Sequence, residues 1–80
     1  MIALLNSGHY FISDYAENIN DLLIDYASYI GAVNMRVFKI LVNSNEMSTE
    51  ELIEYINENA YSYEDKIISI YKLGEIIFKG

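Results

Sequence analysis

The chain has no cysteine, one histidine and only five basic residues in 80. Without cysteine it can form neither a disulfide nor a thiolate metal site. A zinc site needs three or four converging nitrogen, sulfur or oxygen ligands, which a lone His9 does not supply. His9 stands beside Tyr10, and we interpret it as a residue at the edge of a strand. The sequence therefore predicts no metal site and no cofactor.

Catalytic motifs are missing as well. The four glycines are isolated from one another, so the chain has no glycine-rich phosphate loop. No serine stands in the context of a nucleophile elbow. Glutamates four residues apart can hold Ca²⁺ or Mg²⁺ or perform acid–base chemistry, but no EF-hand spacing accompanies them here. We interpret them as a solvated acidic face, and we predict that the protein is not an enzyme.

The chain also lacks a long hydrophobic run. None approaches the roughly 18 apolar residues that span a bilayer, and the first residues lack the basic region of a secretory signal. We therefore expect a cytoplasmic location and no membrane partner. The length predicts a single domain over residues 1–80. Apolar and aromatic residues make up 52% of the chain, and such an excess can be buried between copies, so the sequence leaves homodimerisation open.

Negative charge is what the chain has in excess. The net charge is −7, and it is unevenly spread. Residues 1–35 carry four acids and residues 46–65 carry seven, and neither stretch contains a lysine or arginine. Direct nucleic-acid binding requires a basic footprint, so we expect none. The distribution favours a basic protein partner, or serves solubility alone.

A helix start at Ser48 is the clearest local signal. Ser48 as N-cap and Glu51 three residues later match a capping box, and Met47 is placed to pack on Leu52. The pattern predicts a helix from about Thr49 to Ala60. Its core stripe is expected to contain Leu52, Ile53, Ile56 and Ala60. Its outer stripe is expected to contain Glu50, Glu54, Asn57 and Glu58.

An earlier helix is predicted from Asp14, taken as N-cap with Glu17 at the third helical position. Gly31 is expected to end it. Its buried stripe is expected to contain Ile19, Leu22, Leu23, Tyr26, Ala27 and Ile30. Its opposite stripe contains Asp14, Asn18, Asp21, Asp25 and Ser28, again without a base.

Strands are predicted in the remaining segments. His9–Ile12 reads as a strand, and the apolar run before it is either its hairpin partner or one helical turn ended by Gly8. Val33–Val42 is rich in β-branched and aromatic residues, and its two largely apolar faces predict a central strand. Lys66–Tyr71 and Glu75–Lys79 predict a hairpin whose tight turn uses a positive φ at Gly74.

This element order, (β)β–α–β–α–β–β, predicts an α+β domain. We expect a small antiparallel or mixed sheet of three to five strands, with two helices packed on one face. Because the acids lie mostly on the helices and the bases on the strands, one side should be acidic and the other mildly basic.

The tyrosines are the second feature that suggests an interface. Tyr26 belongs to a core stripe, whereas five others lie beside acids: Tyr15, Tyr29, Tyr55, Tyr61 and Tyr63. Exposed tyrosines are common interface anchors, although some of these could instead cover the sheet edge. The partner-binding residues that we predict are Asp14, Asp21, Asp25, Glu50, Glu54, Glu58, Tyr55 and Tyr61.

Two helical segments carry a resemblance to known proteins. Residues 18–23 read Asn-Ile-Asn-Asp-Leu-Leu, and residues 50–55 read Glu-Glu-Leu-Ile-Glu-Tyr. With the small size and α+β order, they resemble the small acidic phage proteins that mimic DNA, of the anti-CRISPR and antirestriction type. That resemblance implies an inhibitor that occupies the DNA-binding or PAM-reading site of a phage-defence nuclease. The alternative is a homo- or hetero-oligomeric interaction module whose acidic helices only keep it soluble.

Overall fold

The computed structural model describes the backbone of residues 1–72 and 75–79 and the side chains of residues 1–72. The strands are β1 (Ile2–Leu5), β2 (Tyr10–Ile12), β3 (Ile67–Lys72) and β4 (Glu75–Lys79). The helices are α1 (Ile19–Ile30), α2 (Met35–Asn43), α3 (Thr49–Asn59) and the short 3₁₀ helix η1 (Tyr63–Asp65).

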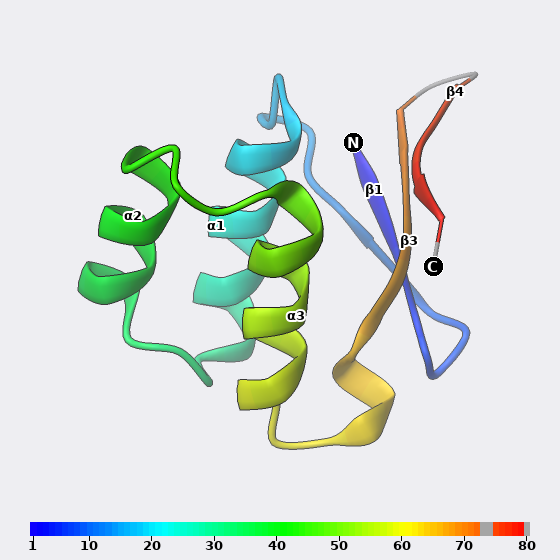
Figure 1. Cartoon of the computed structure of the whole chain (residues 1–80). Helices are drawn as coiled ribbons and strands as arrows, with labels where there is room; N and C mark the ends of the chain where they lie inside the picture. The colour runs from blue at the N-terminus through cyan, green and yellow to red at the C-terminus, as the bar shows by residue number, and fades with distance from the viewer. Residues whose placement is uncertain (73–74, 80) are drawn as a thin grey trace.

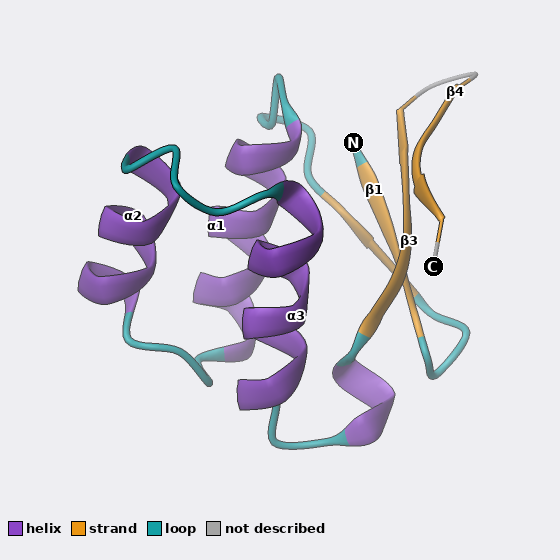
Figure 2. Cartoon of the chain, viewed as in Figure 1, coloured by secondary structure: helices purple, strands orange, loops and turns teal. Residues whose placement is uncertain are grey.

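The four strands form one antiparallel sheet in the order β2-β1-β3-β4. Helices α1 and α3 lie beside one face of this sheet, and α2 lies on their far side (Figures 1 and 2). The predicted α+β class and the placement of helices on one face are confirmed, and of the two predicted sheet types, antiparallel or mixed, the structure has the antiparallel one. The prediction of two helices is wrong, because the described part of the chain contains three α-helices.

Both hairpins at the ends of the chain are present. The first residues pair as β1 with β2, which decides between the two alternatives for this segment, and Gly8 in the turn adopts a φ of 88°. Strands β3 and β4 confirm the second hairpin, whereas the φ expected at Gly74 lies outside the described residues. Pairing of β1 with β3 places the first and third strands at the sheet centre.

The predicted central strand at Val33–Val42 is wrong, because this segment forms helix α2. The side chain of Asn34 accepts a hydrogen bond from the Val37 N–H at 3.1 Å and so caps the first turn. Phe38 and Val42, four residues apart, are buried, as expected for one face of a helix. The β-branched content favoured a strand, but the cap and the helical spacing of the buried residues prevail over that weak preference.

Helix α1 begins later than predicted. Asp14 is not its N-cap, because Asn18 occupies that position and its Oδ1 accepts from the Asp21 N–H at 2.9 Å. Asn and Asp are about equally good caps, so residue type alone could not separate the two starts. The predicted end is confirmed, since Gly31 lies in the left-handed region at φ 65° and donates to the Ala27 carbonyl.

The start predicted for α3 is confirmed in detail. Ser48 Oγ accepts from the Glu51 N–H at 3.1 Å, and Glu51 Oε1 accepts from the Ser48 N–H at 3.0 Å.

The core lies between the sheet and the helices. Among the side chains that the structure describes, the largest fully buried ones are those of Tyr26, Phe38, Leu22, Leu23, Ile56 and Ile70. In the described part of the chain, no helix has the length and apolar character needed to cross a membrane.

Candidate functional site

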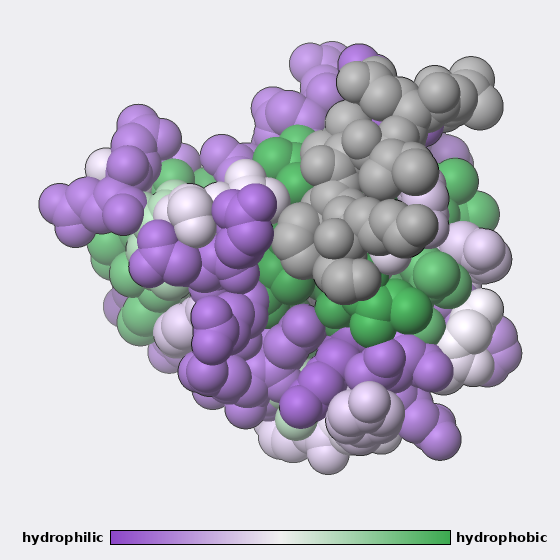
Figure 3. Space-filling view, turned by 45° about the vertical axis from the view of Figure 1, so that its right-hand side comes forward, coloured by the Kyte–Doolittle hydropathy of each residue, from purple (hydrophilic) through white to green (hydrophobic). Residues whose placement is uncertain are grey.

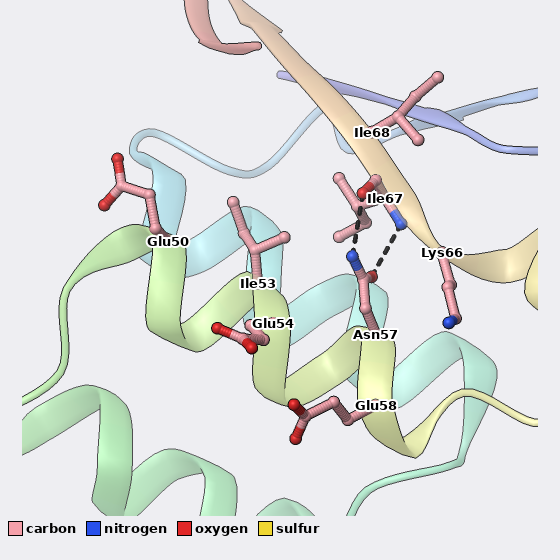
Figure 4. Close-up of a pocket in the computed structure, with 8 residues that line it drawn as sticks. All are labelled: Glu50, Ile53, Glu54, Asn57, Glu58, Lys66, Ile67 and Ile68. Atoms are coloured by element: carbon pink, nitrogen blue, oxygen red, sulfur yellow. Dashed lines mark hydrogen bonds between the residues drawn. The ribbon is translucent and has the colours of Figure 1, made fainter. Parts of the chain in front are cut away.

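An open groove of about 580 Å³ lies between α3 and the start of β3 (Figure 4). The buried side chains of Ile53 and Ile67, with the half-buried Ile68, supply its apolar surface. In Figure 3, green apolar patches lie between purple hydrophilic areas, so the surface on this side of the molecule is mixed. A groove of this composition can bury apolar atoms of a partner while its charged border selects the sign of the partner's charge.

The border of the groove on α3 is a row of three exposed acids, Glu50, Glu54 and Glu58. They are four residues apart, which on a helix brings them to one side at intervals of about 6 Å. Lys66 contributes an opposing charge from the β3 side, so the described side chains that line the groove include three carboxylates and one ammonium. The described lining is therefore negative, and its three acids all belong to the predicted partner-binding set.

Asn57 joins the two walls of the groove. Its Oδ1 accepts from the Ile67 N–H at 2.8 Å, and its Nδ2 donates to the Ile67 carbonyl at 3.0 Å. Ile67 pairs with Leu5 of β1 on one side, whereas the described pairs between β3 and β4 reach only Ser69 with Lys79. The amide takes the place of a strand partner there and fixes α3 against β3. With these backbone groups satisfied, the groove offers carboxylates and apolar side chains.

The three predicted aspartates do not join this groove. Asp14 is exposed in the loop between β2 and α1, and Asp21 is exposed in the first turn of α1. Asp25 lies one turn further on and accepts a hydrogen bond from Ser13 Oγ at 2.5 Å. Because α1 starts only at Ile19, the expectation that Asp14 shares a helical face with Asp21 and Asp25 is wrong.

The two predicted tyrosines also lie outside the groove lining. Tyr55 is half-buried and its ring stacks on Phe38 of α2, with 5.9 Å between the ring centroids. Tyr61 is exposed in the segment after α3, where its hydroxyl lies 3.5 Å from the Gly31 carbonyl oxygen. Tyr55 therefore connects two helices, while Tyr61 keeps most of its ring available.

Sequence reasoning missed several residues of the groove. It placed Asn57 on the outer stripe of its helix but gave it no role, and it assigned none to Lys66, Ile67 or Ile68. No local pattern could reveal these residues, because they become part of the site only when β3 packs beside α3. One signal was available for Asn57, which lies between Glu54 and Glu58 in the sequence of the helix. Residues so close on a helix face the same neighbouring element, here β3.

Two further findings bear on this site. Among the described residues, no three histidine, aspartate or glutamate side chains come close enough together to hold a metal ion. In comparisons with protein-family models, curated proteins and solved structures, none matches this chain.

Proposed function

We propose that the chain is an acidic protein-binding inhibitor, and that its α3–β3 groove receives a basic segment of a partner protein. The row of Glu50, Glu54 and Glu58 above an apolar floor is the observation that carries this proposal. Lysine and arginine match such a groove because their aliphatic stems can cover the isoleucines while their charged ends reach the carboxylates.

The energetics of α3 support a binding role for these acids. Glu50–Glu54 and Glu54–Glu58 are like-charge pairs four residues apart, and each such pair destabilises a helix by roughly 0.2–0.5 kcal/mol. Glu58 also lies near the C-terminal end of the helix, where a negative charge opposes the helix dipole. Solubility does not require this spacing, since acids elsewhere on the surface would supply the same net charge. A basic partner turns the repulsion into attraction.

Mimicry of DNA is the more specific form of the proposal. The row on α3 presents one charge per roughly 6 Å, about half the density of one B-DNA strand at roughly 3.4 Å per phosphate. The groove would thus match a few arginine or lysine contacts rather than a long phosphate track. The partner that fits is the nucleic-acid-binding surface of a nuclease complex, such as a phage-defence nuclease in a bacterial cytoplasm.

The test replaces Glu50, Glu54 and Glu58 together by glutamine, which removes the charges without bringing new cations beside Lys66. A matched control replaces Asp14, Asp21 and Asp25 by asparagine on the α1 side. Both variants and the parent are used as bait in a bacterial lysate at low and high salt. We expect the glutamate variant to lose a salt-sensitive partner while its circular dichroism stays native. Retention of that partner by the glutamate variant would refute the proposal.

A second candidate function rests on the face of the sheet opposite the helices. Ala3 and Leu5 are buried, so the alternating Ile2 and Leu4 point away from the helices. Their cross-strand neighbours on β2, Ile12 and Tyr10, are 61% and 60% exposed. An apolar face next to the short edge strand β2 suits oligomerisation, and here we expect a second copy of the chain.

Ile12→Lys tests this alternative. If the sheet face joins two copies, light scattering should show a dimer for the parent protein and a monomer for the variant. A monomeric parent at all concentrations would eliminate the homodimer and leave the groove as the surface to pursue.

A further inference from the structure

A second cavity, of about 280 Å³, lies between the β1–β2 hairpin, the C-terminal half of α1 and η1. Its wall combines aromatic rings from Phe11, Tyr26 and Tyr29 with the acids Glu64 and Asp65. Drug-sized ligands occupy pockets of roughly 300–1,000 Å³, so this cavity has room for a single side chain rather than a cofactor.

The three rings form a packed cluster. The Phe11 centroid lies 5.0 Å from that of Tyr26 and 5.2 Å from that of Tyr29. These distances leave no space for a ligand between the rings. Tyr26 is fully buried, whereas Tyr29 is 74% exposed. The ring of Tyr29 is therefore the aromatic surface most available to a group that enters the cavity.

The acidic wall is held in place through its main chain. The Glu64 carbonyl accepts from the Ser7 N–H at 3.1 Å, and the Asp65 carbonyl accepts from the Tyr26 hydroxyl. These bonds do not use the carboxylates. Burial, and after it the negative charge of Asp65, raises the pKa of Tyr26 from 10.0 to about 12. That effect agrees with a carboxylate lying close to the aromatic cluster.

Among the residues whose side chains the structure describes, no lysine or arginine lines this cavity. Lys66 follows Asp65 directly, but its Nζ lies 5.3 Å from the centroid of the Tyr63 ring, and the residue lines the α3–β3 groove instead. The described lining of the cavity thus pairs an exposed aromatic ring with two acids, and its one basic side chain is that of His9. A cation supplied from outside would complete this arrangement.

We propose that this cavity binds the guanidinium group of an arginine side chain from the partner protein. Guanidinium is planar, stacks on aromatic rings and donates bidentate hydrogen bonds to carboxylates, so it suits Tyr29 together with Glu64 and Asp65 better than an ammonium does. The inference deepens the proposed function and rests on it for the source of the arginine.

Nuclear magnetic resonance titration with N-acetyl-arginine N-methylamide tests the inference without the partner. The controls are the citrulline analogue, which is neutral and nearly the same shape, the lysine analogue, and free L-arginine. We expect the blocked arginine to bind at millimolar concentration, with its largest shifts at Phe11, Tyr29 and η1. Equal binding of the citrulline or lysine analogue would overturn the guanidinium assignment. Binding of free L-arginine alone would overturn the inference that the arginine belongs to a partner protein.

Variants then locate the binding. Tyr29→Leu and Glu64→Gln should each weaken arginine binding by about two- to fivefold. The matched controls Tyr15→Leu and Glu46→Gln change the same residue types at exposed positions outside the cavity, and they should bind as the parent does. Largest shifts on α3, or equal effects of test and control variants, would overturn the inference. Failure here leaves the groove proposal standing, because the lysate test with the glutamate variant does not involve this cavity.

Discussion

Asn57→Ala tests the contact that holds α3 beside β3. The side-chain amide makes two hydrogen bonds to the main chain of Ile67, with donor–acceptor distances of 2.8 and 3.0 Å. Ile67 is buried, so after the substitution water can reach its N–H and carbonyl only along the groove. The variant therefore leaves the N–H and carbonyl of Ile67 poorly hydrogen-bonded at the first residue of β3.

The expected cost follows from these two bonds. Each contributes about 0.5–1.5 kcal/mol net, which gives roughly 1–3 kcal/mol for the pair. Alanine is the better helix former, and this offsets up to about 0.7 kcal/mol. The free energy of unfolding should thus fall by about 0.3–3 kcal/mol, with the middle of that range at about 1–2 kcal/mol, a large part of the roughly 4–12 kcal/mol typical of a domain this small.

Urea unfolding followed by circular dichroism measures this loss, with Asn59→Ala as the matched control. Asn59 lies in the same helix, is exposed, and its side chain donates to the Tyr55 carbonyl within that helix. With a slope near 1 kcal/mol per molar urea, the midpoint of Asn57→Ala should lie about 1–2 M below that of the control. Equal midpoints would refute the idea that the amide joins the helix to the sheet.

Substitutions at three further residues test local features. Ser48→Ala should lower the free energy of unfolding by about 0.5–2 kcal/mol in urea melts, because it removes the cap of α3; an unchanged midpoint would exclude that role. Gly31→Ala should cost about 1–2 kcal/mol through its φ of 65° alone, since the new Cβ meets no atom within 4 Å, and Gly31→Asn should cost less. Folding raises the pKa of Tyr26 from 10.0 to about 12. The contribution of this side chain to the free energy of unfolding is therefore complete below pH 10 and is lost as the pH rises towards 12. Between pH 10 and 12 the free energy of unfolding of the parent protein should fall by about 1.4 kcal/mol per pH unit relative to that of Tyr26→Phe. Parallel plots of unfolding free energy against pH for the two proteins would contradict this.

The parts of the fold that could be predicted are those set by neighbouring residues. The capping box at Ser48 fixes the start of α3 within four residues of chain, and Gly31 ends α1 because glycine readily adopts a left-handed conformation. The apolar stripe of α1 follows from its spacing in the same way. The row of acids on α3 could also be found, since any helix brings residues four apart to one side.

The parts that could not be predicted depend on distant contacts. The sequence cannot show that β3 packs beside α3, so it could identify the acids of the groove but not its apolar floor or Asn57. It also could not show that η1 lies against the first hairpin, which creates the second cavity. At the first helix two good caps compete, and the loop preceding α1 is fixed by longer-range contacts such as that of Ser13 with Asp25.

Helix α2 is the clearest failure of local reasoning, and one pair of variants tests the structure that replaced the predicted strand. In a strand Phe38 and Ile40 share a face, whereas in a helix residues two apart point in nearly opposite directions. The structure buries Phe38 completely and leaves Ile40 63% exposed. Phe38→Ala should therefore cost about 3–5 kcal/mol, as expected for a buried aromatic side chain.

Ile40→Glu should change the free energy of unfolding by no more than about 0.5 kcal/mol, because the new carboxylate remains in water. It also lies four residues from Arg36, where an opposite charge is mildly favourable. A central strand would instead bury that carboxylate, at a cost of several kcal/mol. Urea melts of the two variants decide between these arrangements. Phe38→Ala confirms that the assay detects loss of packing in this segment, and a comparable loss for Ile40→Glu would mean that the segment is buried on both faces after all.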